Sequence, residues 1–417
     1  MMHGFRISVR KTALLKNGVF VLLVVYLFMV RFSGLAESAM LDELRSKGIS
    51  AGGLNIFPNL KLGYYTDSNI YSEEKVPTSD SVTQIEPSLL IQTNWSRHRF
   101  YIQGGGELYS YQDHSNENHT DIKMMAGGKL DITKKTSLQI NRGMNVLFED
   151  RGSPDDAKGI SPTRYNLNTV NLLLDRKGGV LFIVIDGGIK TFLYDDTTTS
   201  TGVINNDDRD RTENNVSLKL GFQFHPGFQL VVKGGFNQRL YATLVDDNGF
   251  NRHSTGNDIS TGLKFDFGGP LVAELLLGQW SQIYDDVKFG QTNGFSYSGV
   301  LSWSPTRLTS INSILKRTVE ETTLNGSSGV FSSNFNFEIQ HALLRSVVIN
   351  LGFAGGVMEF QKTGRVDNIT SPEIGIRYLA NRYLHIKLGY SQKKKVSTDT
   401  GSGFDRSETK FAVVGRI

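Results

Sequence analysis

Hydrophobic and polar residues alternate with a period of two along most of the chain after residue 52. Between residues 100 and 109 the even positions are apolar or small, whereas the odd positions carry mainly polar side chains and Tyr. The same alternation recurs in the segments 138–146, 216–224, 259–267, 347–353 and 384–391. A period of two is that of a β-strand whose two faces meet different surroundings. No helical stripe competes over a comparable length, so the pattern predicts an all-β chain.

The connections between the expected strands alternate between short and long. Eight short turns are expected at residues 96–98, 133–136, 176–179, 225–227, 268–270, 304–306, 341–345 and 380–382. Nine longer loops rich in Asp, Asn, Ser, Thr and Gly are expected around residues 67–81, 112–119, 150–163, 195–212, 243–257, 285–292, 321–329, 361–368 and 393–406. Seventeen connections predict about eighteen strands, with both termini on the short-turn side.

Alternating strands with short turns at one end and long loops at the other are typical of a transmembrane β-barrel. In lipid every backbone N–H and C=O must be paired, so a sheet can span only if it closes on itself. The pattern therefore predicts a closed antiparallel transmembrane β-barrel with short periplasmic turns and long extracellular loops. A secreted β-solenoid or propeller would also show alternating residues, but it would not explain why short and long connections alternate along the chain.

Aromatic residues near the strand ends predict two belts at the membrane interfaces. The periplasmic belt is expected to contain Phe100, Trp303, Tyr378 and Tyr383, and the outer belt Tyr64, Tyr109, Tyr194, Tyr241, Tyr284 and Tyr390.

The N-terminus has the features of a secretory signal peptide. Basic residues precede twelve uninterrupted apolar residues at 19–30, and small residues at 34 and 36 mark a cleavage site before Glu37. An uncleaved anchor is the alternative, but the apolar run is short for a membrane span. We therefore expect a cleaved signal peptide at 1–36, a short periplasmic segment at 37–53 and the barrel at 54–417. In the middle segment, residues 40–44 have the spacing of a short amphipathic helix, with disorder as the alternative.

Composition narrows the class of protein further. The mean hydropathy of −0.24 excludes a polytopic helical membrane protein, yet suits a barrel in which only alternate strand residues meet lipid. The net charge of +4 over 417 residues gives no reason to expect nucleic acid as a partner. The absence of Cys excludes disulfides, zinc ribbons and thiol nucleophiles together.

Three segments resemble a known family. Residues 58–71 (PNLKLGYYTDSNIY) are similar to the opening strand and first loop of the second family of outer-membrane β-barrel porins to be defined. The patch formed by residues 151–156 and 162–165, and residues 95–98, resemble further parts of that family. Many members of this family accompany exopolysaccharide or capsule production, so the resemblance implies a link to polysaccharide export as one role. The chain departs from the usual pattern at its end, since Ile417 stands where outer-membrane barrels normally close on Phe.

About eighteen strands leave room for a water-filled lumen, so the polar strand faces predict a pore lining. The candidate pore-lining residues are Lys123, Lys129, Lys190, Lys219, Lys233, Arg239, Lys264, Arg377, Lys387, Arg416, Glu107, Asp186, Glu338 and Glu373. With Lys410, and with Asp131, Asp175 and Asp266 on the acidic side, expected inward bases outnumber acids by eleven to seven. Such an excess favours anions in a pore. The alternative is that these charges pair across neighbouring strands and only solvate the wall.

The sequence offers little chemistry for an enzyme. HExxH, GxSxG and a Gly-rich phosphate loop are missing from the chain. His114 and His119, beside Asp113 and Glu117, and the acidic run 195–210 could bind a metal ion, but polar loops account for both. We therefore expect no catalytic residues, no metal and no cofactor.

Three functions remain open on the sequence alone. The first is an outer-membrane channel of a Gram-negative bacterium that passes polar solutes or saccharides by diffusion, with a preference for anions as a further hypothesis. The second is the outer-membrane component of an exopolysaccharide or capsule secretion system, and the third a structural or adhesive surface barrel. Expected partners are outer-membrane lipid and lipopolysaccharide, the barrel-assembly machinery and, in the second case, periplasmic polysaccharide-export proteins.

Overall fold

The computed structural model describes residues 47–417. The expected signal peptide and the expected short helix at 40–44 lie outside the described residues.

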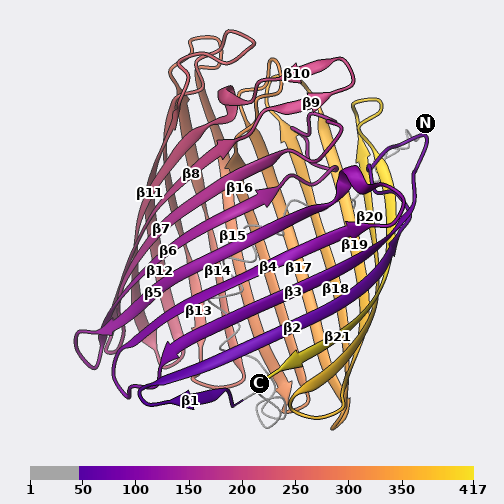
Figure 1. The fold of residues 1–417 in the computed structure, drawn as a ribbon. Coiled ribbons are helices and arrows are strands. Elements are labelled where there is room, and N and C mark those ends of the chain that lie inside the picture. Colours follow the sequence, from indigo (N-terminus) through magenta and orange to yellow (C-terminus); the bar gives the residue numbers. More distant parts are fainter. Residues whose placement is uncertain (1–46) are drawn as a thin grey trace, which may run out of the picture.

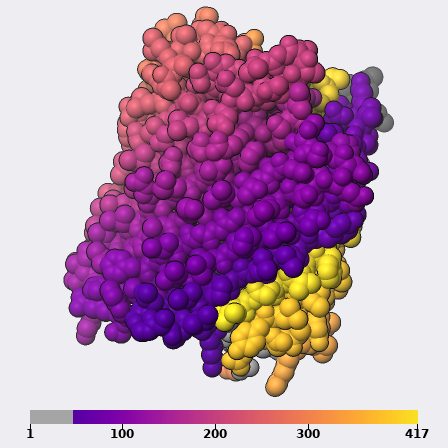
Figure 2. All heavy atoms as spheres, in the orientation of Figure 1, coloured from indigo at the N-terminus to yellow at the C-terminus, as the bar shows by residue number. Residues whose placement is uncertain are grey.

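The described chain forms a closed antiparallel β-barrel (Figure 1). Its main sheet has 19 strands, of which the short β1 is an addition at the edge, so 18 strands form the closed wall. The last strand pairs with the first long one, from Asn59 opposite Arg416 to Asp67 opposite Glu408, and this pairing closes the barrel. In Figure 2 the C-terminal strand lies directly against the N-terminal strands along the wall. The predicted fold class and strand number are confirmed.

The strands of the wall are β2 Leu54–Asp67, β3 Asp80–Thr93, β4 Arg99–Tyr111, β5 His119–Asp131, β6 Thr136–Phe148, β7 Arg164–Arg176, β8 Leu181–Tyr194, β11 Arg211–His225, β12 Phe228–Tyr241, β13 Ser254–Asp266, β14 Leu271–Tyr284, β15 Gln291–Thr306, β16 Thr309–Glu320, β17 Val330–Leu344, β18 Val347–Phe360, β19 Val366–Leu379, β20 Leu384–Ser397 and β21 Phe404–Arg416. Smaller elements are β1 Ile49–Ala51, the hairpin β9 Thr197–Thr199 with β10 Gly202–Ile204, and the 3-10 turns η1 Ser115–Glu117 and η2 Asp207–Arg209.

The predicted alternation of short turns and long loops is present. One of the tightest turns joins β11 to β12 through Pro226 and Gly227, where Gly227 has a φ of +81° that a residue with a Cβ rarely adopts. β9, β10, η1 and η2 all belong to long loops at the opposite end. Within residues 47–417, no helix has the length and apolar character needed to cross a membrane.

The N-terminal segment contributes one short strand that the sequence pattern did not predict. β1 turns back through Gly52 and Gly53 and pairs with the start of β2, with Ile49 opposite Ile56 and Ala51 opposite Leu54. β21 pairs with β2 only from Asn59 onward. β1 therefore pairs with the first residues of β2, which β21 leaves without a neighbouring strand on that side.

The outer face of the wall is apolar, as expected for a lipid-facing surface. Leu60, Leu62 and Tyr64 of β2 are exposed, whereas Lys61 and Tyr65, which alternate with them, point to the inner face. The expected periplasmic belt of Phe100, Trp303, Tyr378 and Tyr383 is exposed on the outside.

The expected outer belt is only partly correct. Tyr64 and Tyr390 are exposed outside, but Tyr109, Tyr194, Tyr241 and Tyr284 occupy inward positions at the loop ends of their strands. Their phenol groups serve packing and hydrogen bonding inside the mouth: Tyr194 stacks on Tyr165, for example. Their parity along the strands, not their aromatic character, decides their face.

One charged residue interrupts the middle of the lipid-facing surface. Arg142 is the central residue of β6, six positions from either end, and its neighbours on the same face are the exposed Ile140 and Met144. Directly opposite it stand Ala126 on β5 and Val170 on β7. The side chain is exposed and, among the described residues, has no ion pair within 4.0 Å.

Candidate functional site

The inner face of the wall is lined by the alternate, mostly polar residues of each strand. Every candidate from the sequence lies at an inward position: the ten bases Lys123, Lys129, Lys190, Lys219, Lys233, Arg239, Lys264, Arg377, Lys387 and Arg416, and the four acids Glu107, Asp186, Glu338 and Glu373. Their role in conduction stays a prediction, since position alone does not establish it.

Many of these inward charges form ion pairs along the wall. Lys219 Nζ lies 2.5 Å from Glu274 Oε1, and Lys264 Nζ lies 3.0 Å from Asp266 Oδ2. Lys123 pairs with Glu107, and Arg239 pairs with Glu321. Of these four pairs, only Lys123 with Glu107 joins neighbouring strands. The alternative of pairing across neighbouring strands therefore stays a prediction for most of the lumen.

The sequence list also left out inward charges of both signs. They include Lys61, Glu86, Asp121, Arg211, Glu213, Asp258, Glu274, Lys316, Glu320, Lys393, Arg406 and Glu408. Each of these residues lies an even number of positions from the polar residues of its strand, and this spacing in the sequence could have identified it as inward-facing. The list overstated the positive excess, because the missed acids balance much of it.

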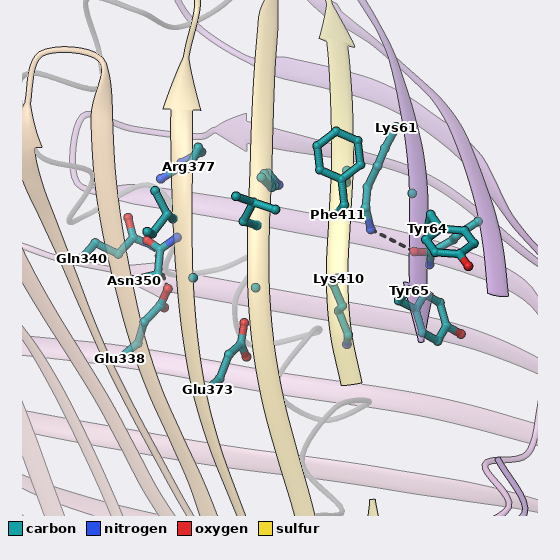
Figure 3. A pocket seen from close by; sticks show the side chains of 18 residues that line it. Lys61, Tyr64, Tyr65, Glu338, Gln340, Asn350, Glu373, Arg377, Lys410 and Phe411 are labelled. Atoms are coloured by element: carbon teal, nitrogen blue, oxygen red, sulfur yellow. Dashed lines mark hydrogen bonds between the residues drawn. The ribbon is translucent and has the colours of Figure 1, made fainter. Parts of the chain in front are cut away.

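One wall recess collects charges from several strands. A cavity of about 340 Å³ opens on the inner face between β17 and β3 across the closure of the barrel, with Lys61, Glu338, Glu373, Arg377, Lys387 and Lys410 among its lining residues. Figure 3 shows Glu338, Glu373 and Lys410 at a similar level, with Arg377 closer to the end where β21 terminates. Lys61 donates hydrogen bonds to Gln84 at 3.2 Å and Glu86 at 2.8 Å. In this recess Arg377 therefore lies nearer the periplasmic end than Glu338 and Glu373, whereas Lys410 lies at their level.

The outer mouth is crossed by the loop between β6 and β7, residues 149–163, here called the inward loop. Asp150 reaches Lys393 of β20 at 2.6 Å and Arg406 of β21 at 3.5 Å, and Lys395 donates to the carbonyl of Gly152 at 3.1 Å. Four strands, β2 to β5, separate β6 from β21 around the wall. The loop therefore leaves its own sector and is fastened to another side of the mouth.

Further contacts hold the inward loop at intermediate points. Arg151 makes two hydrogen bonds with Glu117, of 2.9 and 2.5 Å, and both side chains are almost fully buried. Glu149 of the inward loop forms an ion pair of 2.6 Å with Arg209, which lies in the loop after β8. At the far side, Thr322 donates to Asp155 at 2.7 Å, which ties the inward loop to the loop after β16.

The loop after β16, residues 321–329, is itself held by a buried arginine. Arg252 is 2% exposed and pairs with Asp246 at 2.5 Å. Its guanidinium also donates to the carbonyls of Thr322 and Ser327, at 2.5 and 2.9 Å. Five donors in a planar fork allow a single Arg to satisfy several loop acceptors at once. The Thr322–Asp155 hydrogen bond therefore joins two loops at the outer mouth of the barrel.

Two carboxyl groups of the inward loop have shifted pKa values. Burial raises the pKa of Asp156 to about 6, although Arg151, 3.7 Å away, opposes the shift. For Asp150, burial is outweighed by Lys393 and Arg406, which hold its pKa well below the ordinary range. The contact of Asp150 with Lys393 and Arg406 therefore requires the ionised carboxylate.

The loop residues considered for metal binding have other partners. His114 Nδ1 lies 2.9 Å from Asp80, and His119 Nδ1 lies 2.6 Å from the backbone carbonyl of Glu117. Asp195 pairs with Arg164 at 2.7 Å. Across residues 47–417, no three His, Cys, Asp or Glu side chains converge as metal ligands would.

A closed barrel with an apolar exterior, a charged lumen and a loop folded across its mouth defines the class of porin-like outer-membrane channels. The chain belongs to the family described as putative beta-barrel porin 2, whose model matches residues 44–416. No curated protein matches the chain.

Several solved outer-membrane proteins are similar to the chain at low sequence identity. The outer membrane protein OpdK from Pseudomonas aeruginosa is similar with a TM-score of 0.44 and 11% identity, covering 87% of this chain and 99% of that one. OccK9 (OpdG) from the same organism gives a TM-score of 0.45 and 11% identity, with 87% and 98% covered. The FrpB iron transporter from Neisseria meningitidis gives 0.47 and 10% identity, with 85% and 64% covered.

Proposed function

We propose that the chain is a diffusion channel in the outer membrane of a Gram-negative bacterium that passes small polar solutes. The observation that carries this proposal is the inward loop fastened across the mouth of a wide barrel. A barrel of 18 strands has a lumen wider than a small solute needs, and a loop across it supplies a size limit. The charged inner wall provides a path on which ions and polar molecules are solvated.

Charge along the path supports a modest preference for anions. Ion pairs neutralise much of the wall, whereas basic residues gather at the periplasmic end. An anion that enters the lumen would meet this basic region last, before it leaves toward the periplasm. Rings of Lys and Arg favour anions in pores.

Conductance across planar bilayers tests the proposal. We expect steps of current from the purified barrel, larger steps when residues 152–159 are replaced by a short Gly-Ser linker, and a reversal potential of anionic sign in a KCl gradient. The heat-dependent mobility shift of folded barrels in SDS gels checks that each variant is folded. A folded barrel that conducts neither with nor without the inward loop would exclude the channel. Cation selectivity would exclude the anion preference alone.

Export of a polysaccharide is the second proposed function, and it places periplasmic export proteins among the partners. A polymer would have to displace the inward loop from all its contacts. For this reason passage of small solutes is the first proposed function and polysaccharide export the second. Deletion of the gene with measurement of secreted polysaccharide separates the two, because unchanged secretion would remove the export role. Lipopolysaccharide and the barrel-assembly machinery are partners that either function requires.

A further inference from the structure

The wall of the barrel is interrupted between β15 and β16 in its outer half. The ladder between these two strands ends with Ser298 opposite Lys316, at the middle of β15. Both strands continue toward the outer end of the barrel, where β15 stays paired with β14 and β16 with β17. Residues 291–297 and 317–320 therefore form two sheet edges that are not paired with each other. This interruption is here called the seam.

Beyond the seam, the outer ends of β16 and β17 lie against the inner wall of β12 and β14. Phe331 of β17 is opposite Val319 and has the parity of a lipid-facing residue, yet it is only 8% exposed. Its ring packs edge-to-face on that of Trp280, an inward residue of β14, with 4.7 Å between the ring centroids. Arg239 on the inner wall of β12 donates a hydrogen bond of 2.9 Å to the carbonyl of Val319. The two edges therefore overlap, and Trp280 and Arg239 hold the inner one in place.

A recess of about 380 Å³ lies on the outer surface beside the seam, over β13, β14 and β15. It is here called the outer recess. Two rows of directly opposed residues line it: Asn257, Ser281 and Asn293 nearer the outer end of the strands, and Ile259, Gln279 and Phe295 nearer the middle. None of its eight lining residues is charged. The amide and hydroxyl groups of the outer row can each donate and accept hydrogen bonds, whereas Ile259 and Phe295 give the second row an apolar surface.

Trp280 connects the outer recess with the inner side of the wall. It lines the recess, although its ring lies on the inward side of β14 across Gly294, where a Cβ would stand 2.5 Å from the ring. The side chain is 7% exposed, and its Nε1 has no hydrogen-bond partner among the described residues. Arg317, the first residue of β16 beyond the ladder, pairs with Glu359 through Nη2 but likewise has a buried Nε without a hydrogen bond in the described part of the chain.

These unpaired groups need acceptors that the chain does not supply. A buried donor without a partner costs free energy, and an open sheet edge is not tolerated where it faces hydrocarbon. Packing on Trp280 and Arg239 covers the seam from the lumen only. A molecule with oxygen acceptors and an apolar part, bound from the membrane side, would cover it from outside.

We propose that the seam and the outer recess form a lateral binding site for an amphiphile with an alkyl chain and an uncharged, hydroxyl-rich head group such as a sugar. The outer row of Asn257, Ser281 and Asn293 binds the head group, and Ile259 and Phe295 contact the chain. Movement of Phe331 away from Trp280 lets the chain pass between the outer leaflet and the lumen. This function goes beyond the diffusion of small polar solutes through the mouth, and it requires the folded barrel but no conductance.

Quenching of tryptophan fluorescence by a brominated alkyl chain tests the site. Trp95→Phe/Trp303→Phe leaves Trp280 as the single fluorophore, and the folded barrel is placed in phosphatidylcholine vesicles that contain an alkyl maltoside with bromine on its chain. Bromine quenches at close range, so we expect a loss of Trp280 fluorescence comparable to that of Trp303, which is exposed on the lipid-facing side. Trp303 is measured alone in Trp95→Phe/Trp280→Phe. Loss at Trp303 without loss at Trp280 would overturn the proposal.

An inward control separates entry at the seam from entry through the mouth. Adding Phe192→Trp to Trp95→Phe/Trp280→Phe/Trp303→Phe places the fluorophore on the inner face of β8, where both neighbouring ladders continue past Phe192 or end on it. Its fluorescence should be retained in the brominated maltoside. Equal loss at this position and at Trp280 would show that the amphiphile enters through the mouth, and the lateral path would be excluded.

Release of the inner edge tests the passage itself. Arg239→Gln, in the variant with Trp280 alone, removes the hydrogen bond to Val319 and should raise the apparent affinity for the brominated maltoside several-fold. Arg211→Gln is the matched control, because Arg211 is similarly buried, 14% against 11% exposed, but bonds to Glu213 and Arg209. An equal rise in both variants would contradict a specific role of the seam.

A second amphiphile tests the head group. Brominated phosphatidylcholine carries charges that the outer recess does not match, so it should quench Trp280 less than the brominated maltoside does; equal quenching would overturn the assignment to hydroxyl-rich head groups. The heat-dependent mobility shift in SDS gels shows that each variant is folded. Conductance measures the channel and fluorescence the seam, so either proposal can fail while the other stands.

Discussion

Asp150 Oδ2 and Lys393 Nζ lie 2.6 Å apart although 243 residues separate them in the chain. This contact joins the loop after β6 to the inner wall of β20, and Arg406 of β21 adds a second positive charge at 3.5 Å from the same carboxylate. The Asp150 side chain is about half exposed, whereas that of Lys393 is mostly covered. The pair is therefore a fastening point at the edge of solvent, and solvent screening weakens it.

Asp150→Asn should loosen the inward loop without unfolding the barrel. A partly exposed ion pair contributes on the order of 1 kcal/mol or less, so the free energy of unfolding should change little. The open-channel current should become noisier and larger on average, because the loop leaves the mouth more often. Single-channel recording measures this. Lys393→Gln should give the same result, and Asp150→Asn/Lys393→Gln should add little to either, whereas additive effects would show that the two residues act separately.

Arg151→Ala should release the inward loop more completely. Arg151 and Glu117 have side chains only 6% and 2% exposed, so the substitution leaves a buried carboxylate without its partner. Loss of one member of a buried pair costs about 3–5 kcal/mol. Trypsin cleavage after the exposed Lys158 measures how often the loop leaves its packed position, and the rate should rise by orders of magnitude.

Arg164→Ala is the matched control for Arg151→Ala. Its ion pair with Asp195 is about half exposed on both sides, so its loss should cost about 1 kcal/mol or less. An equal rise of cleavage in both variants would show that burial does not set the strength of these contacts.

The pH dependence of the loop should follow Asp156. Its pKa in the folded loop is about 6, above the ordinary value of 3.8. A raised pKa means that the folded state binds the proton more tightly, so this group favours the packed loop at low pH and loses that contribution as pH rises from about 4 to 6. Asp150 acts in the opposite sense, because its lowered pKa costs stability only as pH falls below about 4.

Tryptic cleavage of the loop should therefore be faster at pH 7.5 than at pH 5.5, after correction for the activity of the protease on an unfolded peptide. Asp156→Asn should remove most of this difference and slow cleavage at pH 7.5. Cleavage that is independent of pH in the wild type would show that Asp156 is ionised in the packed loop without penalty.

The alternation of hydrophobic and polar residues was sufficient to predict the barrel architecture. In a strand with one face in lipid and one in water, hydrophobic residues must recur at every second position. The same parity already placed Tyr109 with Tyr101, Gln103 and Glu107 on the polar face. Its assignment to the outer belt followed from residue type, and the register of β4 corrects it. Parity is the stronger signal, since a shift by one residue would turn every side chain of the strand to the other face.

Contacts between distant strands could not be read from one sequence. Lys219 was expected on the inner face, but its partner Glu274 is 55 residues away and lies three strands further along the wall. The inward loop poses the same difficulty: its charged residues 150, 151, 155 and 156 look like those of any solvated loop. Only the closure of the barrel brings Lys393, Arg406 and Thr322 within their reach.

The central Arg142 of β6 should destabilise the isolated barrel in lipid. Its guanidinium lies at the middle of the strand on the lipid-facing side, between the exposed Ile140 and Met144. A charged side chain near the bilayer midplane costs about 2–4 kcal/mol, and close to zero near the interfaces. Arg142→Leu should therefore raise the free energy of unfolding in phospholipid vesicles by about 2–4 kcal/mol, measured by urea titration with tryptophan fluorescence. Arg176→Leu, at the periplasmic end of β7, should change it by about 1 kcal/mol or less. A barrel made less stable by Arg142→Leu would mean that the guanidinium has a stabilising contact in the membrane that the charge penalty conceals.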